Sequence, residues 1–212
     1  MPIATDERFL GCIIVSVAER PERLARTAEL VDRLSGVAAH AVTALENGRL
    51  VDHITHQARH DHLTGAANRV GVQERLAAVT AKADPASVAL FNIDLDEFKP
   101  INDEHGHDVG DDLLRAVAQR LRECLRGDDT VARLGGDEFA VLVENVTQPR
   151  QLDGISRRLG KAFAAPLRAG GRSFAVSASI GRAVWPVDGD SPGALLRHAD
   201  AAMYAVKRAG RA

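Results

Sequence analysis

The amino-acid sequence predicts an α/β fold, an α+β sandwich in which helices flank a mixed sheet. Three observations support this prediction. Residues 88–93 are apolar apart from Asn92, which is typical of a central strand buried on both faces. Residues 131–143 hold two apolar segments around a Gly-Gly pair, as in a β-hairpin. Around these strands apolar residues recur at helical spacing, which predicts the flanking helices.

The composition excludes several classes of protein. With 45% hydrophobic and 26% charged residues, the 212-residue chain has an ordinary globular composition. Its net charge of -2 and its aromatic content of 4% argue against a nucleic-acid surface, which needs basic grooves and stacking rings. The two cysteines lie far apart, form no metal-binding spacing and fit the reducing cytoplasm. We therefore expect a cytoplasmic protein whose phosphate contacts come from local groups.

The first 60 residues are expected to form a separate N-terminal part, followed by a domain over residues 61–212. Residues 8–18 predict a buried strand, because this apolar run is too short to span a bilayer and lacks the pattern of a signal peptide. One strand and one or two helices cannot close a core. We interpret this part as a connector or a remnant of a sensor domain, and residues 44–50 resemble the last helix of GAF sensor domains.

A long helix is predicted between Pro21 and about His60. Its apolar residues alternate in steps of three and four, as in the seam of a coiled coil. The seam consists of Leu24, Ala28, Val31, Leu34, Ala38, Ala41 and Leu45. After Gly48 the apolar phase shifts, which predicts a break or a stutter. Two interpretations stay open: a helix packed on its own domain, and a signalling helix that dimerises.

Turn formers at residues 61–69 separate this helix from a shorter one at about 69–83. The strand over residues 88–93 then ends in Asp94-Leu95-Asp96. Because α/β folds keep their chemistry at the ends of central strands, these acids are candidate functional groups.

Residues 98–111 are polar and contain glycines, which indicates a functional loop or a short helix. A helix over about 110–126 follows. Capping of that helix is the alternative role for Asp108 and Asp111.

The hairpin turn places Asp137 and Glu138 next to Gly135 and Gly136. Two carboxylates 4 Å apart repel by roughly 4 kcal/mol at an effective dielectric constant of 20, and a shared cation removes this cost. Glycines without a Cβ let a ligand approach the backbone. The turn therefore predicts a metal and phosphate site, and the alternative is an ordinary turn with solvated acids.

The C-terminal third predicts an amphipathic helix over residues 148–166 and a hairpin turn at 167–174. The turn leads into a long strand whose inward residues alternate; these are Phe174, Val176, Ala178 and Ile180. Ser191-Pro192 opens the last helix. Tyr204, Lys207 and Arg211 share one face of it, and the alternative role of the two cations is to complement the helix dipole.

Four motifs follow one another along residues 61–211. They are Asp61-x-Leu63-Thr64-Gly65-x-x-Asn68-Arg69, Phe91-x-Ile93-Asp94-x-Asp96-x-Phe98-Lys99-x-Ile101-Asn102-Asp103, Gly106-His107-x-x-Gly110-Asp111 and Arg133-x-Gly135-Gly136-Asp137-Glu138-Phe139. In order and spacing they resemble the GGDEF family, the diguanylate cyclases. The resemblance implies a palm-like fold shared with nucleotide cyclases and polymerases, preceded here by the N-terminal strand and signalling helix.

The resemblance implies that two GTP molecules are condensed into cyclic di-GMP, with release of two pyrophosphates. It implies that Mg²⁺ or Mn²⁺ is bound by Asp94, the carbonyl of Leu95 and Asp137, with Glu138 as a further ligand or helper. Asp137 would also help to remove the proton of the attacking 3′-hydroxyl. Metal ions serve phosphoryl transfer by lowering the pKa of that hydroxyl and neutralising the leaving group.

The resemblance also implies a set of GTP-binding residues. They are Lys99, Asn102, His107, Asp111, Gly135, Gly136, Lys207 and Arg211. Asn102 and Asp111 would pair with the guanine edge, which both accepts and donates hydrogen bonds. His107 would lie in the nucleotide pocket, and the three cations would contact the phosphates.

Arg126-Gly127-Asp128-Asp129 has the Arg-x-x-Asp form of the family's product-inhibition site. The resemblance implies that cyclic di-GMP binds at Arg126 and Asp129, with Arg157 or Arg158 as a second arginine. The alternative is a charged turn before a strand.

Because each domain would hold one GTP, we expect a homodimer with two-fold symmetry. The alternative function is a non-catalytic module that binds GTP or cyclic di-GMP. A polymerase-type palm acting on nucleic acid is disfavoured by the lack of basic grooves, and no membrane segment is expected.

Overall fold

The computed structural model describes residues 2–4, 9–14, 28–81, 88–146 and 148–210. It divides into two compact units, residues 1–56 and residues 57–212, and each is described here by itself. The domain boundary expected between residues 60 and 61 stays a prediction.

The first unit contains a short strand pair and most of a long helix. Strands β1 (Pro2–Ala4) and β2 (Phe9–Cys12) are antiparallel. The prediction of a buried strand over residues 8–18 is wrong for its described part, since β2 ends at Cys12 and Phe9 is 69% exposed. Two short strands alone provide no second layer that could bury them. Residues 15–18 of the predicted strand lie outside the described residues.

Helix α1 (Ala28–Arg59) runs without interruption through Gly36 and Gly48. The helix break predicted near Gly48 is therefore absent, and the shift of apolar phase leaves the backbone helical. Apolar side chains along α1 are exposed; these are Val31, Val37, Leu45, Leu50, Val51 and Ile54. Among the described helices, none combines the length and the apolarity that crossing a bilayer requires.

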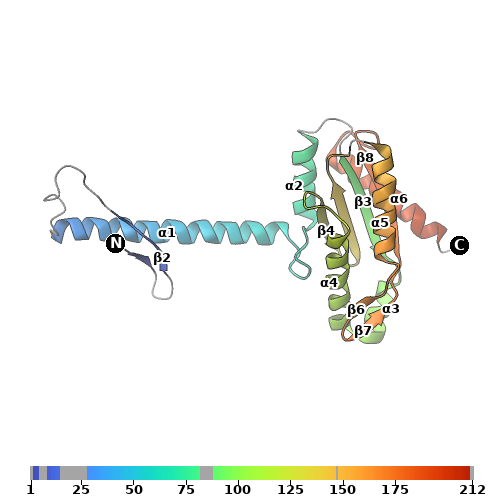
Figure 1. The fold of residues 1–212 in the computed structure, drawn as a ribbon, viewed down its shortest axis with the longest axis horizontal. Helices are drawn as coiled ribbons and strands as arrows, with labels where there is room; N and C mark the ends of the chain where they lie inside the picture. The colour runs from blue at the N-terminus through green and yellow to red at the C-terminus, as the bar shows by residue number, and fades with distance from the viewer. Residues whose placement is uncertain (1, 5–8, 15–27, 82–87, 147, 211–212) are drawn as a thin grey trace. The chain divides into compact units, whose positions relative to one another are not determined.

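The second unit is built on a four-stranded sheet (Figure 1). The strand order is β4 (Thr130–Gly135), β5 (Glu138–Val143), β3 (Val88–Leu95) and β8 (Ala178–Trp185), and neighbouring strands are antiparallel. Within the described ranges, parallel pairing with the sheet is limited to the isolated bridge between Ala67 and Ala132. The α/β fold class is confirmed, and the sheet is more antiparallel than the expected mixed sheet.

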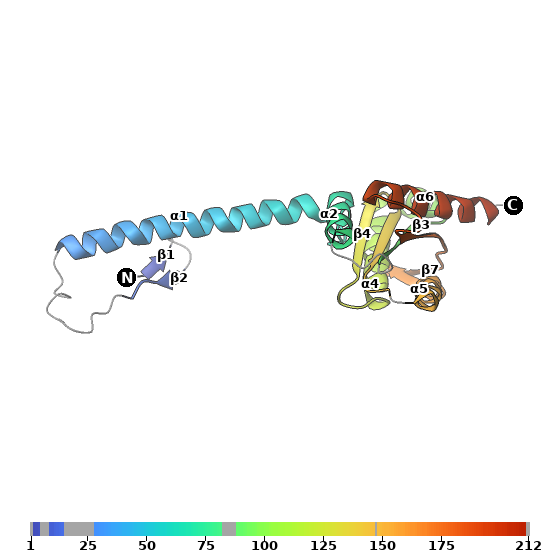
Figure 2. The ribbon, with the colours of Figure 1, turned by 90° about the horizontal axis from the view of Figure 1, so that it is seen from above.

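Two helical layers enclose this sheet. Helices α4 (His107–Glu123) and α5 (Pro149–Ala162) cover one face, while α2 (Arg69–Thr80) and α6 (Pro192–Ala209) cover the other (Figure 2). Strand β3 is buried on both sides, which explains why its residues are apolar apart from Asn92 and Asp94. Its odd-numbered residues belong to the α4 side, and its even-numbered residues point to α2 and α6. Asn92 and Asp94 therefore face α2 and α6.

Two local predictions change in the structure. The polar segment after β3 forms helix α3 (Phe98–His105). The long strand predicted from Phe174 to Ile180 is two strands, because β7 (Arg172–Phe174) pairs with β6 (Leu167–Ala169) and the central sheet resumes only at β8. Alternating apolar residues mark strand conformation, but they do not say which neighbour a strand pairs with.

Candidate functional site

The acids predicted as a site lie at one end of the central strands. Asp94 of β3 is directly opposite Glu138 of β5, and opposed residues of neighbouring strands share one face of a sheet. Asp94 is buried, with 7% of its surface exposed. The Leu95 amide donates a hydrogen bond of 3.3 Å to the Asp137 carbonyl, which ties the hairpin turn to the end of β3. The structure thus brings Asp94, Leu95, Asp137 and Glu138 together.

The second acid at the end of β3 has a different environment. Asp96 accepts hydrogen bonds from the hydroxyls of Ser177 at 2.8 Å and Ser179 at 2.9 Å. These bonds anchor the start of β8 to the end of β3. Asp96 therefore fixes the sheet edge, while Asp94 points to the layer of α2 and α6.

The Gly-Gly turn is accessible to a ligand, and the side chain of Arg133 holds its backbone in place. Gly136 has a φ of 50°, in the left-handed region that favours glycine, and a side chain at Gly135 or Gly136 would contact nothing within 4 Å. The Arg133 guanidinium donates two hydrogen bonds to the Gly136 carbonyl, at 2.9 and 2.8 Å. It also binds both carboxylate oxygens of Asp61 at 3.2 Å. The turn is therefore rigid on one side and accessible on the other.

Two cations face the acid pair. The Lys207 ammonium of α6 forms an ion pair and hydrogen bond with the Asp94 carboxylate. The guanidinium of Arg69, the first residue of α2, lies 3.6 Å from the Glu138 carboxylate. The sequence predicted Lys207 as a site residue, but Arg69 was noted only as part of a motif.

The carboxyl group of Glu138 has a raised pKa in this site. Burial raises the pKa of its carboxyl above the ordinary value, and the charges of Asp200, Asp94 and Asp137 raise the pKa further against the lowering effect of Arg69. Burial and the three neighbouring carboxylates therefore both disfavour the charged form of Glu138. Such a site attracts an additional cation.

The acids fit a divalent metal ion in their chemistry. In the part of the chain that the structure describes, no three His, Cys, Asp or Glu side chains are already arranged around a common point. Mg²⁺ does not require such a cage, because it binds one or two carboxylates and takes other ligands from water and substrate phosphates. Asp94 already attracts a cation, the Lys207 ammonium, which shows that its carboxylate faces a cation position.

The predicted guanine-binding residues lie on the neighbouring helices α3 and α4. Asn102 is half-buried, and its Oδ1 has no hydrogen-bond partner among the described residues. Asp111 is half-buried in the second turn of α4, and Lys99 and His107 are exposed. Arg211 lies outside the described residues.

Helix capping does not explain the acids at the start of α4. The N-cap residue is Gly106, and no side chain caps this end. Asp108 lies in the first turn, where a negative charge complements the helix dipole, but Asp111 lies beyond it. The capping alternative considered for Asp111 is therefore wrong.

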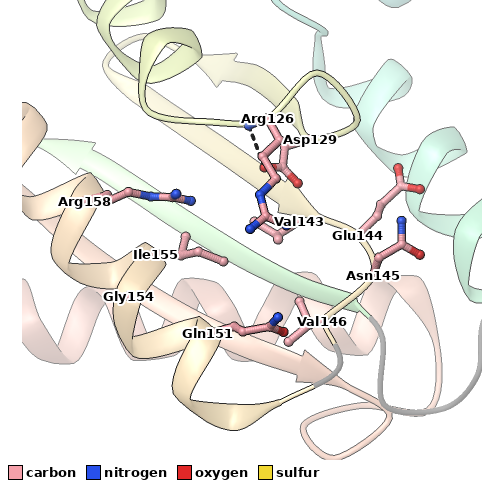
Figure 3. A pocket seen from close by; sticks show the side chains of 10 residues that line it. All are labelled: Arg126, Asp129, Val143, Glu144, Asn145, Val146, Gln151, Gly154, Ile155 and Arg158. Atoms are coloured by element: carbon pink, nitrogen blue, oxygen red, sulfur yellow. Dashed lines mark hydrogen bonds between the residues drawn. The ribbon is translucent and has the colours of Figure 1, made fainter.

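A hollow of about 180 Å³ adjoins the Arg-x-x-Asp turn (Figure 3). Arg126, Asp129 and Arg158 are among its lining residues, whereas Arg157 is not. Figure 3 shows the guanidinium groups of Arg126 and Arg158 approaching it from different elements. The Asp129 carboxylate accepts a hydrogen bond of 3.0 Å from the Arg126 amide, which fixes the turn. Two convergent guanidinium groups favour an anionic ligand.

Sequence reasoning missed a polar contact between β3 and α6. The Asn92 side-chain amide donates a hydrogen bond of 3.1 Å to the Asp200 carboxylate. The available signals were an Asn inside an apolar strand and an Asp inside an apolar helix, since buried polar residues need partners.

An antiparallel sheet with acids at the ends of adjacent strands, an open glycine turn and a facing lysine defines a domain with the nucleotide-cyclase-like α/β fold. The family described as "Diguanylate cyclase, GGDEF domain" matches residues 58–212. The chain therefore belongs to the GGDEF family. No comparison supports the resemblance of residues 44–50 to a GAF domain.

Known relatives agree with this assignment. The diguanylate cyclase TpbB of Pseudomonas aeruginosa is 42% identical over 161 residues, which are 74% of this chain and 37% of TpbB. The solved structure of an N-terminally truncated TpbB mutant, comprising only the GGDEF domain, matches with a TM-score of 0.67 and 41% identity over 70% of this chain and 88% of that one. The chain spans between 20% and 44% of the length of the curated relatives it matches.

A second relative has a coiled coil before its GGDEF domain. The coiled coil and GGDEF domain of DgcB from Caulobacter crescentus, solved in complex with c-di-GMP, matches with a TM-score of 0.74 and 27% identity. The match covers 85% of this chain and 95% of that one. A helical segment before the GGDEF domain is thus shared with a solved relative.

Proposed function

We propose that this protein is a diguanylate cyclase, which condenses two GTP molecules into cyclic di-GMP and releases two pyrophosphates. The observation that carries the proposal is the buried carboxylate of Asp94 opposite Glu138, beside an open Gly-Gly turn. Family membership and the likeness to TpbB support the same activity.

We assign the metal-binding role to Asp94, the Leu95 carbonyl, Asp137 and Glu138. A bound Mg²⁺ or Mn²⁺ would supply charge neutralisation and an acidified 3′-hydroxyl. The 3′-hydroxyl oxygen of one GTP forms a bond to the α-phosphorus of the other, and the bond from that phosphorus to the pyrophosphate oxygen breaks. The Asp137 carboxylate assists in taking the hydroxyl proton. The same step, with the two nucleotides exchanged, closes the ring.

The remaining site residues bind the nucleotide. Asn102 and Asp111 pair with the guanine edge, and the unpartnered Asn102 Oδ1 supplies an acceptor for a guanine N–H. His107 lines the nucleotide pocket. The open backbone at the glycine turn receives the phosphates, which contact three cations, Lys99, Lys207 and Arg211.

Each domain holds half of the reaction centre, so product formation requires a two-fold homodimer. Of the predicted seam, Val31 and Leu45 are exposed on α1, whereas Leu24 lies outside the described residues. These exposed residues and the coiled coil of DgcB support a pairing role for the helix. We assign dimerisation to the seam of α1.

The direct test of the function is incubation of the purified chain with GTP and Mg²⁺, followed by separation of the nucleotides. We expect cyclic di-GMP and pyrophosphate from the wild-type chain. Asp137→Ala and Asp94→Ala should reduce turnover by at least about a thousandfold, because the charge that stabilises the transition state is lost, with the fold retained in circular dichroism. GTP binding without product would instead favour the non-catalytic module.

We further propose that cyclic di-GMP inhibits the enzyme at the hollow of Arg126 and Asp129. Arg158 supplies the second guanidinium. Arg126→Ala should raise the inhibition constant of cyclic di-GMP by roughly tenfold or more, because a hydrogen bond to a charged group contributes about 1.5–3 kcal/mol. Arg157→Ala, next to Arg158 on α5, is the matched control and should leave the inhibition constant unchanged. Equal inhibition curves for wild type and Arg126→Ala would remove the regulatory site.

A further inference from the structure

We propose that Lys207 is the resident counter-ion of Asp94 in the nucleotide-free domain, and that it yields this carboxylate to a divalent cation when a triphosphate offers it a new partner. The inference rests on the proposed function and adds a coupling between two ligands. The metal ion and GTP would each bind weakly alone and more tightly together.

Burial makes the ion pair necessary when no ligand is bound. The side chain of Asp94 is 10% exposed and that of Lys207 is 20% exposed. An unpaired carboxylate in such surroundings is costly, because little water is available to solvate it. The lysine ammonium supplies the missing charge. It also occupies Oδ1, one of the two carboxylate oxygens that could bind a metal ion.

The position of Lys207 is fixed by how α6 lies on the sheet. A side chain at Gly181 of β8 would collide with the backbone of Ala199 and Met203, so α6 contacts the strand directly. Asp200 of α6 binds Asn92 of β3 at 3.1 Å. These two contacts fix the register of the helix on the sheet.

Given the contact between Asp200 and Asn92, the periods of the helix and the strand place Lys207 beside Asp94. Lys207 lies seven residues after Asp200, which is two helical turns along the same face. Asp94 lies two residues after Asn92, on the same face of the strand. The helix backbone can stay in place while the four-carbon stem of Lys207 changes rotamer. The exchange of partners is therefore local.

The metal ion therefore competes with the Lys207 ammonium for Asp94, whereas the metal ion and the triphosphate strengthen each other's binding. A metal ion that binds alone must displace the ammonium and leave it without an anion. A triphosphate removes this penalty, because its oxygens accept the lysine. By linkage, each ligand must then strengthen the other by the same factor. The second ion pair, Arg69 with Glu138, is longer and more exposed, so it opposes metal binding less.

The test measures Mn²⁺ binding to the full-length chain without nucleotide. The electron paramagnetic resonance signal of free Mn²⁺ reports how much of the ion stays unbound. Lys207→Met and Lys207→Gln should bind Mn²⁺ on the order of tenfold more tightly than the wild type, within the range of coupled sites. Lys207→Arg keeps the cation and should stay close to the wild type. Arg208→Met, which removes one charge from an exposed neighbour, is the matched control and should change the affinity less than about twofold.

The inference is overturned if the Mn²⁺ affinity is unchanged in both Lys207→Met and Lys207→Gln with melting curves like the wild type. It is also overturned if Arg208→Met gains as much affinity. Because nucleotide is absent, the result is independent of turnover. A gain in Lys207→Met with no cyclic di-GMP formed by the wild type upholds the inference and rejects the proposed activity. If the wild type forms cyclic di-GMP but Lys207→Met gains no Mn²⁺ affinity, the proposed activity is upheld and the inference is rejected. No Mn²⁺ binding by any variant rejects both the inference and the assigned metal ligands.

Discussion

The Asn102 side chain can take its position only because residue 110 is a glycine without a side chain. A Cβ at Gly110 would overlap Asn102 Oδ1 and would lie 2.8 Å from Asn102 Cγ and 3.3 Å from the ring of Phe98. Gly110 is buried in α4, where its conformation needs no glycine. The reason for a glycine here is therefore space for the amide that we assign to guanine.

We predict that Gly110→Ala raises the KM for GTP by roughly five- to a hundredfold with a smaller effect on kcat, because displacing Asn102 loses a hydrogen bond with a cost of about 1–3 kcal/mol. Gly160→Ala is the control, since a Cβ there meets nothing within 4 Å. Steady-state kinetics with GTP measures both. Unchanged KM in a folded Gly110→Ala protein would contradict the role of Asn102.

At the scale of elements, Arg133 joins two turns that are distant in sequence. Asp61, in the turn after α1, accepts hydrogen bonds from the Thr64 amide at 2.9 Å and the Thr64 hydroxyl at 2.7 Å. Its carboxylate also binds Arg133, which holds the Gly136 carbonyl. Burial acts to raise the pKa of Asp61, but the hydrogen bonds of Thr64 and the Arg133 charge outweigh it and lower the pKa. The turn of the candidate site is thus supported by the turn that follows α1.

We predict that Asp61→Asn destabilises the domain by about 1–3 kcal/mol at pH 7, because charge-assisted hydrogen bonds are lost. A lowered folded pKa means that this stability is present above the unfolded pKa, about 4, and is lost as pH falls through the folded pKa. The gap in Tm between the wild type and Asp61→Asn should therefore narrow toward pH 3. Asp190→Asn, at an exposed position, should show no gap at either pH. A gap of equal size at pH 7 and pH 3 would contradict the assignment.

At the scale of the whole molecule, α1 is the candidate for holding two domains together. Its last residues belong to the second unit: the Asn68 side chain donates to the Ala58 carbonyl at 2.8 Å, and Arg59 pairs with Glu74 at 2.7 Å. The last residues of α1 are therefore anchored to α2 and to the residue that precedes it. Because these contacts need residues 57–60, a fragment for testing should begin at residue 57.

We predict that residues 57–212 are less dimeric and less active than the full chain at equal concentration, because the apolar seam of α1 is removed. In the full chain, Leu45→Glu places a charge on the seam, while Val37→Glu places one off the seam at a similarly exposed residue. Leu45→Glu should lower the dimer fraction in sedimentation and the rate of product formation; Val37→Glu should not. Equal behaviour of the two variants would refute the assigned seam.

Local patterns in the sequence determined the fold class and singled out the candidate site groups. The apolar run of β3 and the glycine turn between β4 and β5 are local signals, because burial on both faces and tight turns restrict residue types along a short stretch. Asp94, Asp137 and Glu138 stood out for the same reason, as acids next to buried strands. Seam residues on α1 followed from period alone.

Pairing across the molecule was decided only by the tertiary structure. Lys207 meets Asp94 across 113 positions, and Asn92 meets Asp200 across 108, because the register of α6 on the sheet sets both contacts. The same dependence explains the strand misassigned through Phe174 and the presence of Arg158, rather than Arg157, in the hollow. Periodicity determines which face a residue takes, whereas its partner depends on side-chain packing between elements that no local stretch contains.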